Sequence, residues 1–160
     1  EPMARRAPSS RRLILLVCTG NTCRSPMAAA LLRHRLPGGA PWQVGSAGIA
    51  SAAGQPAAAE AIAALADTGV DLGDHTSRPL TPDLVDAASL IVVMTAAQRD
   101  TVHHLYPRAR EKVFMLNDFT PGAHGRDIAD PIGSSERVYR RTRDEMAQAL
   151  PGLLKFLEQL

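Results

Sequence analysis

Short apolar runs alternate with longer helical patterns along most of this chain. The runs are rich in Leu, Ile and Val and are too short for core helices, so they predict buried strands. The longer segments begin near proline or a small polar residue, as helices often do. Strands are predicted at Arg12–Val17, Gln43–Ser46, Leu90–Met94 and Lys112–Leu116. Helices are predicted at Pro26–Arg35, Pro56–Asp67, Pro82–Ala87, Ala96–Leu105 and Ser134–Leu157.

This alternation predicts parallel strands joined by crossover helices. We therefore expect an α/β fold of three layers, in which helices cover both faces of an open four-stranded parallel sheet. Pro151 lies inside the last predicted helix and should kink or split it, because proline lacks a backbone donor and clashes with the preceding turn. Such sheets bind ligands beyond the carboxyl ends of their strands, so functional residues are expected at that edge.

The composition agrees with one compact domain. The chain has 160 residues, of which 45% are hydrophobic and 21% charged, enough for one core and little more. We expect a single domain at 12–160, preceded by a disordered, arginine-bearing arm at 1–11. The formal net charge is only +2, so the chain has no basic footprint that would indicate a nucleic-acid partner.

A basic start, an apolar run and a cysteine could also indicate a lipoprotein signal. The run before Cys18 has only five apolar residues, and Val17 is too bulky for a cleavage site. No segment approaches the ~20 apolar residues of a membrane helix. Cys18 and Cys23 match neither zinc-ligand spacing nor a disulfide scaffold. We therefore expect a cytoplasmic protein with no membrane partner, no metal and no cofactor.

The most informative segment follows the first predicted strand and reads CTGNTCRSP from Cys18 to Pro26. Gly20 and Asn21 adopt positive φ most readily, so the backbone can curl tightly there. Pro26 lies where helices often begin. A loop closed in this way points its N–H groups inward, toward the positive end of the following helix. The segment after the first strand therefore predicts a phosphate-binding loop.

Three side chains of this loop predict catalysis as well as binding. Cys18 is expected to be a thiolate, since cations and helix N-termini favour that form. Arg24 can offer a planar fork to two phosphoryl oxygens, and Ser25 can donate a hydrogen bond to the thiolate. The alternative is a buried structural thiol beside a solvated arginine, which is the usual fate of either residue alone.

The Cys-x5-Arg-Ser pattern resembles the nucleophile loop of cysteine-dependent phosphatases. Its position near the N-terminus is similar to that in the low-molecular-weight protein tyrosine phosphatase family. Four later motifs also resemble this family, and the similarity covers Leu13–Leu157. The resemblance implies a cysteinyl-phosphate intermediate, a phosphorylated protein substrate, and a monomer or weak dimer. The later motifs are Ser46–Gly48, Asp74–Thr81, Asp130-Pro131 and Tyr139–Glu145.

A proton donor for the leaving group is expected from the long loop at 117–134. Its candidates are Asp118, Asp127 and Asp130. Pro131 holds the residue before it in an extended conformation, which aims the Asp130 carboxyl, and the Asp-Pro pair resembles the general acid of the family. The resemblance implies that Asp130 is the acid and afterwards the base. For the other two, a role as turn residue or helix cap is the alternative.

The resemblance also implies supporting and binding residues around the catalytic three. Ser46 and His75 would hold Asn21 in its turn. The other histidines match no catalytic or metal pattern, and His103 and His104 are expected on a solvated helix face. Residues that would contact the phosphoryl group or substrate are Thr19, Gly20, Asn21, Thr22, Cys23, Ser25 and Ile132.

Two positions indicate the substrate class. Phosphotyrosine-specific members usually have a bulky apolar residue at the position of Thr22 and aromatic residues after the Asp-Pro pair, whereas this chain continues with Ile132–Ser135. Thr22 resembles the protein-arginine phosphatase branch, although that branch usually has phenylalanine where Ile132 stands. Phosphotyrosine is the alternative substrate. Arsenate reduction needs further cysteines that this chain lacks, and a non-catalytic binding module could dispense with Cys18 and Asp130.

Overall fold

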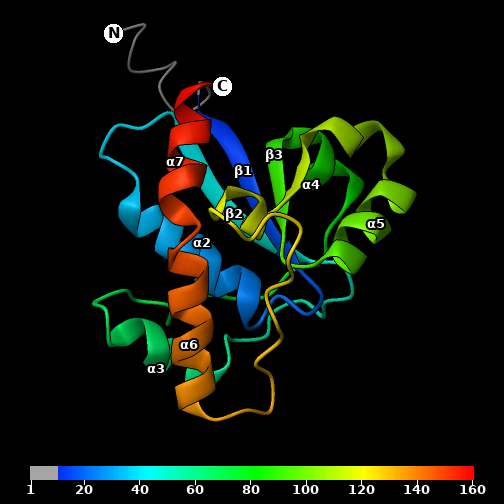
Figure 1. Cartoon of the computed structure of the whole chain (residues 1–160). Coiled ribbons are helices and arrows are strands. Elements are labelled where there is room, and N and C mark those ends of the chain that lie inside the picture. The colour runs from blue at the N-terminus through cyan, green and yellow to red at the C-terminus, as the bar shows by residue number, and fades with distance from the viewer. Residues whose placement is uncertain (1–10) are drawn as a thin grey trace, which may run out of the picture.

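The computed structural model describes residues 11–160, and its elements form one layered unit (Figure 1). The arm expected at 1–11 lies outside the described residues except for Arg11, whose guanidinium donates to the carbonyl of Trp42 at 3.2 Å. None of the helices in the described range has the length and apolarity needed to span a bilayer.

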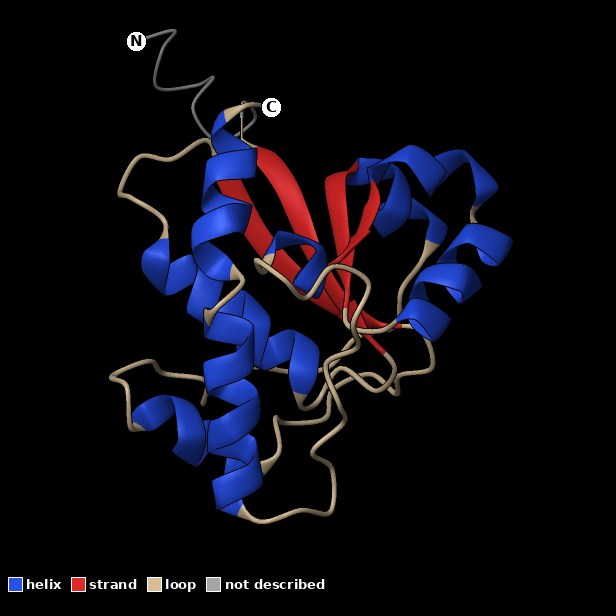
Figure 2. Ribbon diagram, viewed as in Figure 1, coloured by secondary structure: helices blue, strands red, loops and turns tan. Residues whose placement is uncertain are grey.

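The centre of the fold is a four-stranded sheet whose strands are all parallel, as the sequence predicts (Figure 2). The order β2-β1-β3-β4 places the first strand inside the sheet and makes β2 an edge strand. A parallel sheet needs crossover connections, which the intervening helices provide. The strands are β1 Arg12–Cys18, β2 Trp42–Gly48, β3 Ala88–Val93 and β4 Val113–Met115.

Helices cover both faces of the sheet, so the predicted three layers are confirmed (Figure 1). Alternate residues of β1 enter different cores, with Ile14 and Leu16 in one and Leu15 and Val17 in the other, because side chains of a strand point to opposite faces in turn. The first core is completed by α2 Arg24–Arg35, α3 Ala59–Ala66, α6 Glu136–Ala147 and α7 Leu150–Glu158. The second is completed by α4 Pro82–Ala87 and α5 Ala96–Leu105.

Several predicted boundaries are wrong by a few residues. Helix α2 begins at Arg24 rather than Pro26, because a proline in the first turn costs no intrahelical bond. Helix α3 begins three residues after Pro56, which forms an isolated bridge with Thr76. The fourth strand ends before Leu116, where a short 3-10 helix, η3 Leu116–Phe119, begins. A second 3-10 helix, η2 Pro107–Lys112, precedes that strand.

The last predicted helix is split, as its proline predicts. Helix α6 ends at Ala147 and α7 begins at Leu150. Pro151 is the second residue of α7, a position whose N–H would have no intrahelical partner. Helix α6 packs against α2 and α3, whereas α7 packs against η3.

Two of the three candidate acids have structural roles, which confirms the alternative for them. Asp118 accepts hydrogen bonds from the N–H of Met115 at 3.0 Å and of Gly125 at 3.2 Å. Asp127 accepts one from the N–H of Ala96 at 2.9 Å, at the start of α5. Both carboxylates therefore hold backbone in place, and only Asp130 remains as a candidate acid in this loop.

The expected solvated face of α5 is wrong for one of its two histidines. His104 is exposed, but His103 is half-buried, and its Nε2 is buried with no hydrogen-bond partner in the described part of the chain. Burial lowers the pKa of His103, and the charges of Arg110 and Arg99 add to this effect. Its ring therefore packs as a neutral group.

Candidate active site

The first strand delivers Cys18 to the carboxyl edge of the sheet, where its side chain is only 3% exposed. Ser25 Oγ lies 2.9 Å from Cys18 Sγ, and the backbone N–H of Asn21 donates to the same sulfur at 3.2 Å. Ser25 is the second residue of α2, which begins at Arg24, so the sulfur lies beside the first turn of this helix. The sulfur thus accepts a backbone hydrogen bond and lies within hydrogen-bond distance of a hydroxyl.

Asn21 is the strained residue of the loop, with a φ of 60°, and it is fully buried. Its Nδ2 donates to Ser25 Oγ at 2.8 Å and to Ser46 Oγ at 3.0 Å. Its Oδ1 accepts from the N–H of Arg78 at 3.0 Å, and its carbonyl lies 2.7 Å from His75 Nε2. Four side-chain or carbonyl contacts thus hold a backbone conformation that non-glycine residues rarely adopt.

His75 is held in one tautomer by this arrangement. Burial lowers its pKa; the charges of Arg33 and Arg78 act in the same direction, while the bond to Asn21 opposes them. The ring is therefore neutral near pH 7. Because a carbonyl only accepts hydrogen bonds, Nε2 carries the proton, and Nδ1 is left as an acceptor.

A glycine at the end of β2 lets the loop approach the sheet closely. A Cβ on Gly48 would lie 2.6 Å from the carbonyl oxygen of Thr19 and 3.0 Å from the Cβ of Asn21. The backbone has to come this near because the carbonyl of Cys18 accepts a hydrogen bond from the N–H of Ile49 at 2.9 Å. Any larger residue at this position would push the loop away from its support.

Arg24 and Asp130 face one another across the mouth of the loop. Arg24 is buried; its Nη1 donates to the carbonyl of Ile128 at 2.8 Å, and its Nη2 lies 3.5 Å from Asp130 Oδ2. The Asp130 side chain is 45% exposed, so this ion pair contributes little to stability. The second oxygen, Oδ1, accepts from the N–H of Ile132 at 3.1 Å, which aims the carboxyl.

These residues line one small cavity of about 40 Å³. On this measure a single water needs roughly 10–15 Å³, so the cavity accommodates a group of a few non-hydrogen atoms, such as an oxyanion. Ile132 stands at its rim with 64% of its surface exposed. The lining residues are Cys18, Gly20, Asn21, Thr22, Cys23, Arg24, Asp130 and Ile132.

Two predicted contact residues lie outside this lining. Ser25 is fully buried beneath the loop and touches the sulfur from behind. Thr19 is exposed, and its Oγ1 accepts a hydrogen bond from Gln98 Nε2 at 3.1 Å. The remaining predicted residues, Ser46 and His75, reach the cavity only through Asn21.

The family model described as low molecular weight phosphotyrosine protein phosphatase matches residues 13–160. The chain belongs to this phosphatase family. It is 42% identical to a protein-arginine-phosphatase of Geobacillus stearothermophilus, over 91% of this chain and 95% of that protein. It is 43% identical to a probable low molecular weight protein-tyrosine-phosphatase of Ralstonia nicotianae, over 75% and 78% of the two chains.

Solved structures of family members agree with the fold. The arginine phosphatase of Geobacillus stearothermophilus superimposes with a TM-score of 0.84 at 41% identity, over 92% of this chain and 94% of that one. A low molecular weight protein tyrosine phosphatase from T. tengcongensis has a TM-score of 0.84 at 33% identity, over 90% and 98%. The order of strands and helices is thus that of the phosphatase family along nearly the whole chain.

Sequence reasoning missed three residues of this phosphatase site. Gln98 ties the loop to β3 and α5, since its Oε1 accepts from the N–H groups of Met94 at 2.9 Å and Thr95 at 3.1 Å. The signal was present as Thr95-x-x-Gln98, a capping box. Arg78 bonds Asn21 through its backbone, which no residue pattern reveals. The sequence places Tyr139 in the Tyr139–Glu145 motif and assigns it no contact.

Tyr139 distinguishes the second thiol of the site from the first. Its hydroxyl lies 3.3 Å from Cys23 Sγ, and both residues are buried. Burial raises the pKa of the Cys23 thiol, although the hydrogen bonds of Tyr139 and Thr22 partly offset this. Cys23 therefore remains a neutral thiol near pH 7, although it is the N-cap residue of α2.

No group of three or more His, Cys, Asp or Glu side chains in residues 11–160 is arranged to hold a metal ion.

Two substitutions of Asn21 should separate the contributions of backbone strain and of hydrogen bonding to the free energy of unfolding. Asn21→Ala loses the side-chain bonds and keeps a side chain at positive φ, so we expect a loss of about 2–4 kcal/mol in the free energy of unfolding. Asn21→Gly loses the same bonds without the strain and should be about 1 kcal/mol more stable than the alanine variant. Urea unfolding of both variants checks this. Equal stability of the two would mean that the backbone relaxes at this position.

Proposed function

We propose that this protein is a protein-arginine phosphatase that hydrolyses phosphoarginine side chains through a cysteinyl-phosphate intermediate. The observation that carries the proposal is Thr22 on the lining of the Cys18 cavity. A small hydroxyl stands there in a chain about 40% identical, over most of its length, to proteins named protein-arginine-phosphatase in Geobacillus stearothermophilus and Bacillus subtilis. We also propose cytoplasmic phosphoproteins as substrates and a monomer or weak dimer as the working form.

In the first step, Cys18 Sγ attacks the phosphorus of a phosphoryl group held in the loop. A sulfur–phosphorus bond forms as the phosphorus–nitrogen bond breaks, and its electron pair passes to the leaving nitrogen. Asp130, in its acid form, gives that nitrogen a proton, because a guanidine anion is too poor a leaving group. The loop N–H groups and Arg24 bind the phosphoryl oxygens and stabilise the charge that develops on them.

In the second step, water hydrolyses the cysteinyl-phosphate. The Asp130 carboxylate takes a proton from the water as its oxygen attacks phosphorus, and the sulfur–phosphorus bond breaks. The electron pair returns to Cys18, whose thiolate accepts hydrogen bonds from Ser25 and from the N–H of Asn21. Inorganic phosphate then leaves. The nucleophile and the proton both come from side chains, so the proposed mechanism needs no cofactor.

Thr22 supports the choice of a nitrogen-linked phosphate. The residue is half-buried on the cavity, where a hydroxyl can join the hydrogen bonds of a phosphoguanidinium. A branched alkyl group at the same position would crowd the planar group and leave its N–H donors unpaired, which costs more than an apolar contact gains.

The segment after Pro131 argues against a phenol ring as the leaving group. It carries no aromatic residue from Ile132 to Ser135, so a phosphotyrosine ring would have no aromatic face to stack on. Phosphotyrosine remains the competing substrate, because other relatives are named low molecular weight protein-tyrosine-phosphatases.

The test compares phosphoarginine and phosphotyrosine peptides with wild type and Thr22→Ile. We expect wild type to prefer phosphoarginine in kcat/KM, and Thr22→Ile to reduce that preference by about tenfold or more, since one well-placed hydroxyl accounts for roughly 1–2 kcal/mol of discrimination. Thr101→Ile, an exposed threonine on α5, is the matched control and should behave as wild type. Efficient phosphotyrosine turnover that is indifferent to Thr22 would overturn the proposal.

A further inference from the structure

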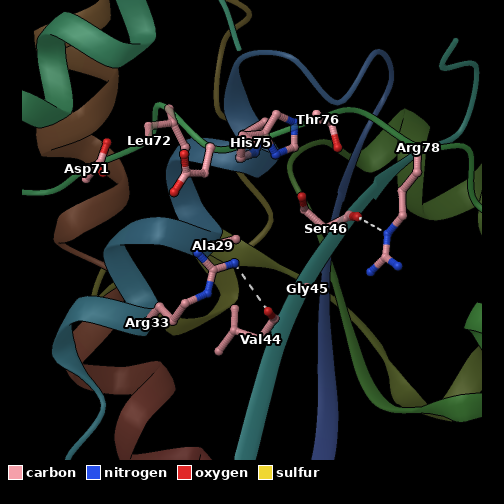
Figure 3. A pocket seen from close by; sticks show the side chains of 12 residues that line it. Ala29, Arg33, Val44, Gly45, Ser46, Asp71, Leu72, His75, Thr76 and Arg78 are labelled. Carbon is pink, nitrogen blue, oxygen red and sulfur yellow. Dashed lines mark hydrogen bonds between the residues drawn. The ribbon is translucent and has the colours of Figure 1, made fainter. Parts of the chain in front are cut away.

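A second pocket, of about 450 Å³, lies beside the residues that support the phosphate loop (Figure 3). It is formed by α2, the outer edge of β2 and the loop at 71–78. Its volume falls in the range of small-molecule sites, roughly 300–1,000 Å³. Nothing in the proposed mechanism uses this pocket.

Backbone donors of the edge strand face the pocket. The carbonyl of Val44 accepts from Arg33 Nη2 at 3.2 Å and that of Ser46 from Arg78 Nε at 2.9 Å, so both residues turn their backbone groups away from β1. The N–H of a strand residue points to the same side as its carbonyl. Neither N–H has an acceptor among the described residues.

The two arginines also retain donors beyond these bonds. A guanidinium has five N–H groups, and each of the two contacts above uses one. Figure 3 shows Arg33 and Arg78 on either side of Gly45 along the edge strand. His75 joins them, and their charges reach its ring. The pocket therefore offers several donors and positive charge.

Two carboxylates line the same pocket. Asp71 and Asp74 line it from the loop, and neither forms an ion pair within 4.0 Å with Arg33 or Arg78. Asp71 Oδ1 accepts only from the N–H of Gly73 at 2.8 Å. Charges of both signs thus line one cavity without forming an ion pair with each other.

We propose that this pocket binds a small zwitterion of the basic amino acid class. Its carboxylate would lie against Arg33, Arg78 and the edge-strand N–H groups, where charge-assisted hydrogen bonds are strong. Its side-chain cation would lie toward Asp71 and Asp74. A simple anion would leave those two carboxylates facing it, and a simple cation would face the two guanidiniums, so a ligand with both charges fits best.

A ligand in this pocket would affect the phosphate loop without contacting the substrate. Three residues that line the pocket also contact Asn21: Ser46 and His75 with their side chains, and Arg78 with its backbone. A ligand that orders these residues also orders the strained residue of the loop. The inference goes beyond the proposed function, and its test needs no turnover.

The experiment titrates L-lysine into the wild-type protein while the backbone amides and histidine rings are followed by NMR. L-lysine is the probe because it lacks the guanidinium that the proposed active site would admit. We expect saturable shifts at Val44, Ser46 and His75, with smaller ones at Asn21. Cadaverine, which lacks the carboxylate, and L-norleucine, which lacks the distal ammonium, should each bind at least about tenfold more weakly.

Variants of the pocket keep the test decisive. Arg33→Gln and Asp74→Asn should each weaken L-lysine binding by about tenfold or more, while Arg35→Gln, an exposed arginine of the same helix, should leave it unchanged. None of the three contacts the Cys18 cavity, so turnover of p-nitrophenyl phosphate should stay at the wild-type rate. The absence of saturable shifts, shifts confined to residues 18–25, or equal binding to Arg33→Gln would each overturn the proposal.

Discussion

Cys18→Ser is expected to lower kcat by about 10⁴-fold or more while binding of inorganic phosphate persists. A serine hydroxyl at this position is not ionised near neutral pH, so it cannot attack phosphorus as the thiolate does. The loop N–H groups and Arg24, which bind the oxygens, are untouched by the change. The turnover of p-nitrophenyl phosphate and the Kd of phosphate, measured by calorimetry, report the two effects separately.

Cys23→Ser is the matched control for that result, since it makes the same chemical change five residues along the loop. Cys23 Sγ lies against the hydroxyl of Tyr139, and burial raises the pKa of its thiol, so we expect its serine variant to keep most of the turnover. If Cys18→Ser kept more than a few per cent of the wild-type kcat, a different nucleophile would have to be sought.

Asp130→Asn is expected to lower kcat by about 10²–10⁴-fold on substrates with poor leaving groups and by much less on p-nitrophenyl phosphate. The amide keeps the shape of the side chain and can no longer donate an acidic proton. A nitrophenolate leaves readily without one, whereas the nitrogen of phosphoarginine does not. The effect should therefore grow with the basicity of the leaving group.

The measurement is kcat for a series of aryl phosphates and a phosphoarginine peptide, in wild type and Asp130→Asn. The activated aryl phosphate serves as an internal control, because a variant that merely misfolds loses activity on every substrate. Equal losses along the whole series would remove Asp130 from the role of acid and leave it as a partner of Arg24, whose Nη2 lies 3.5 Å from its carboxylate.

Both predictions depend on the phosphate loop, whose conformation is held by residues outside the loop. Asn21 keeps its positive φ through contacts with Ser25, Ser46, His75 and Arg78, which come from α2, β2 and the loop at 71–78. Arg24, which lines the cavity, donates to the carbonyl of Ile128, and the N–H of Ile128 donates in turn to the carbonyl of Met94 at 2.9 Å. The cavity therefore depends on residues from several segments that are far apart in the sequence.

The pattern of the sequence alone determined the parts of this protein that depend on local interactions. Apolar runs placed four strands, and alternation with helices predicted that the strands are parallel. The segment from Cys18 to Ser25 predicted a tight anion loop, because glycine and asparagine there permit positive φ and a helix follows. Pro131 marked Asp130 among three aspartates, since proline restricts the residue before it.

The tertiary structure alone decided what depends on residues far apart in the chain. It set the order β2-β1-β3-β4, tied Gln98 to Thr19 across 79 positions, and placed Arg33 and Arg78 along one edge strand. No local pattern encodes these contacts, because they form only when burial of two cores brings the elements together. The tight loop after the first strand could thus be predicted from the sequence, and the family resemblance added Ser46 and His75 as its supports, whereas Arg78, Gln98 and the pocket beside the loop required the fold.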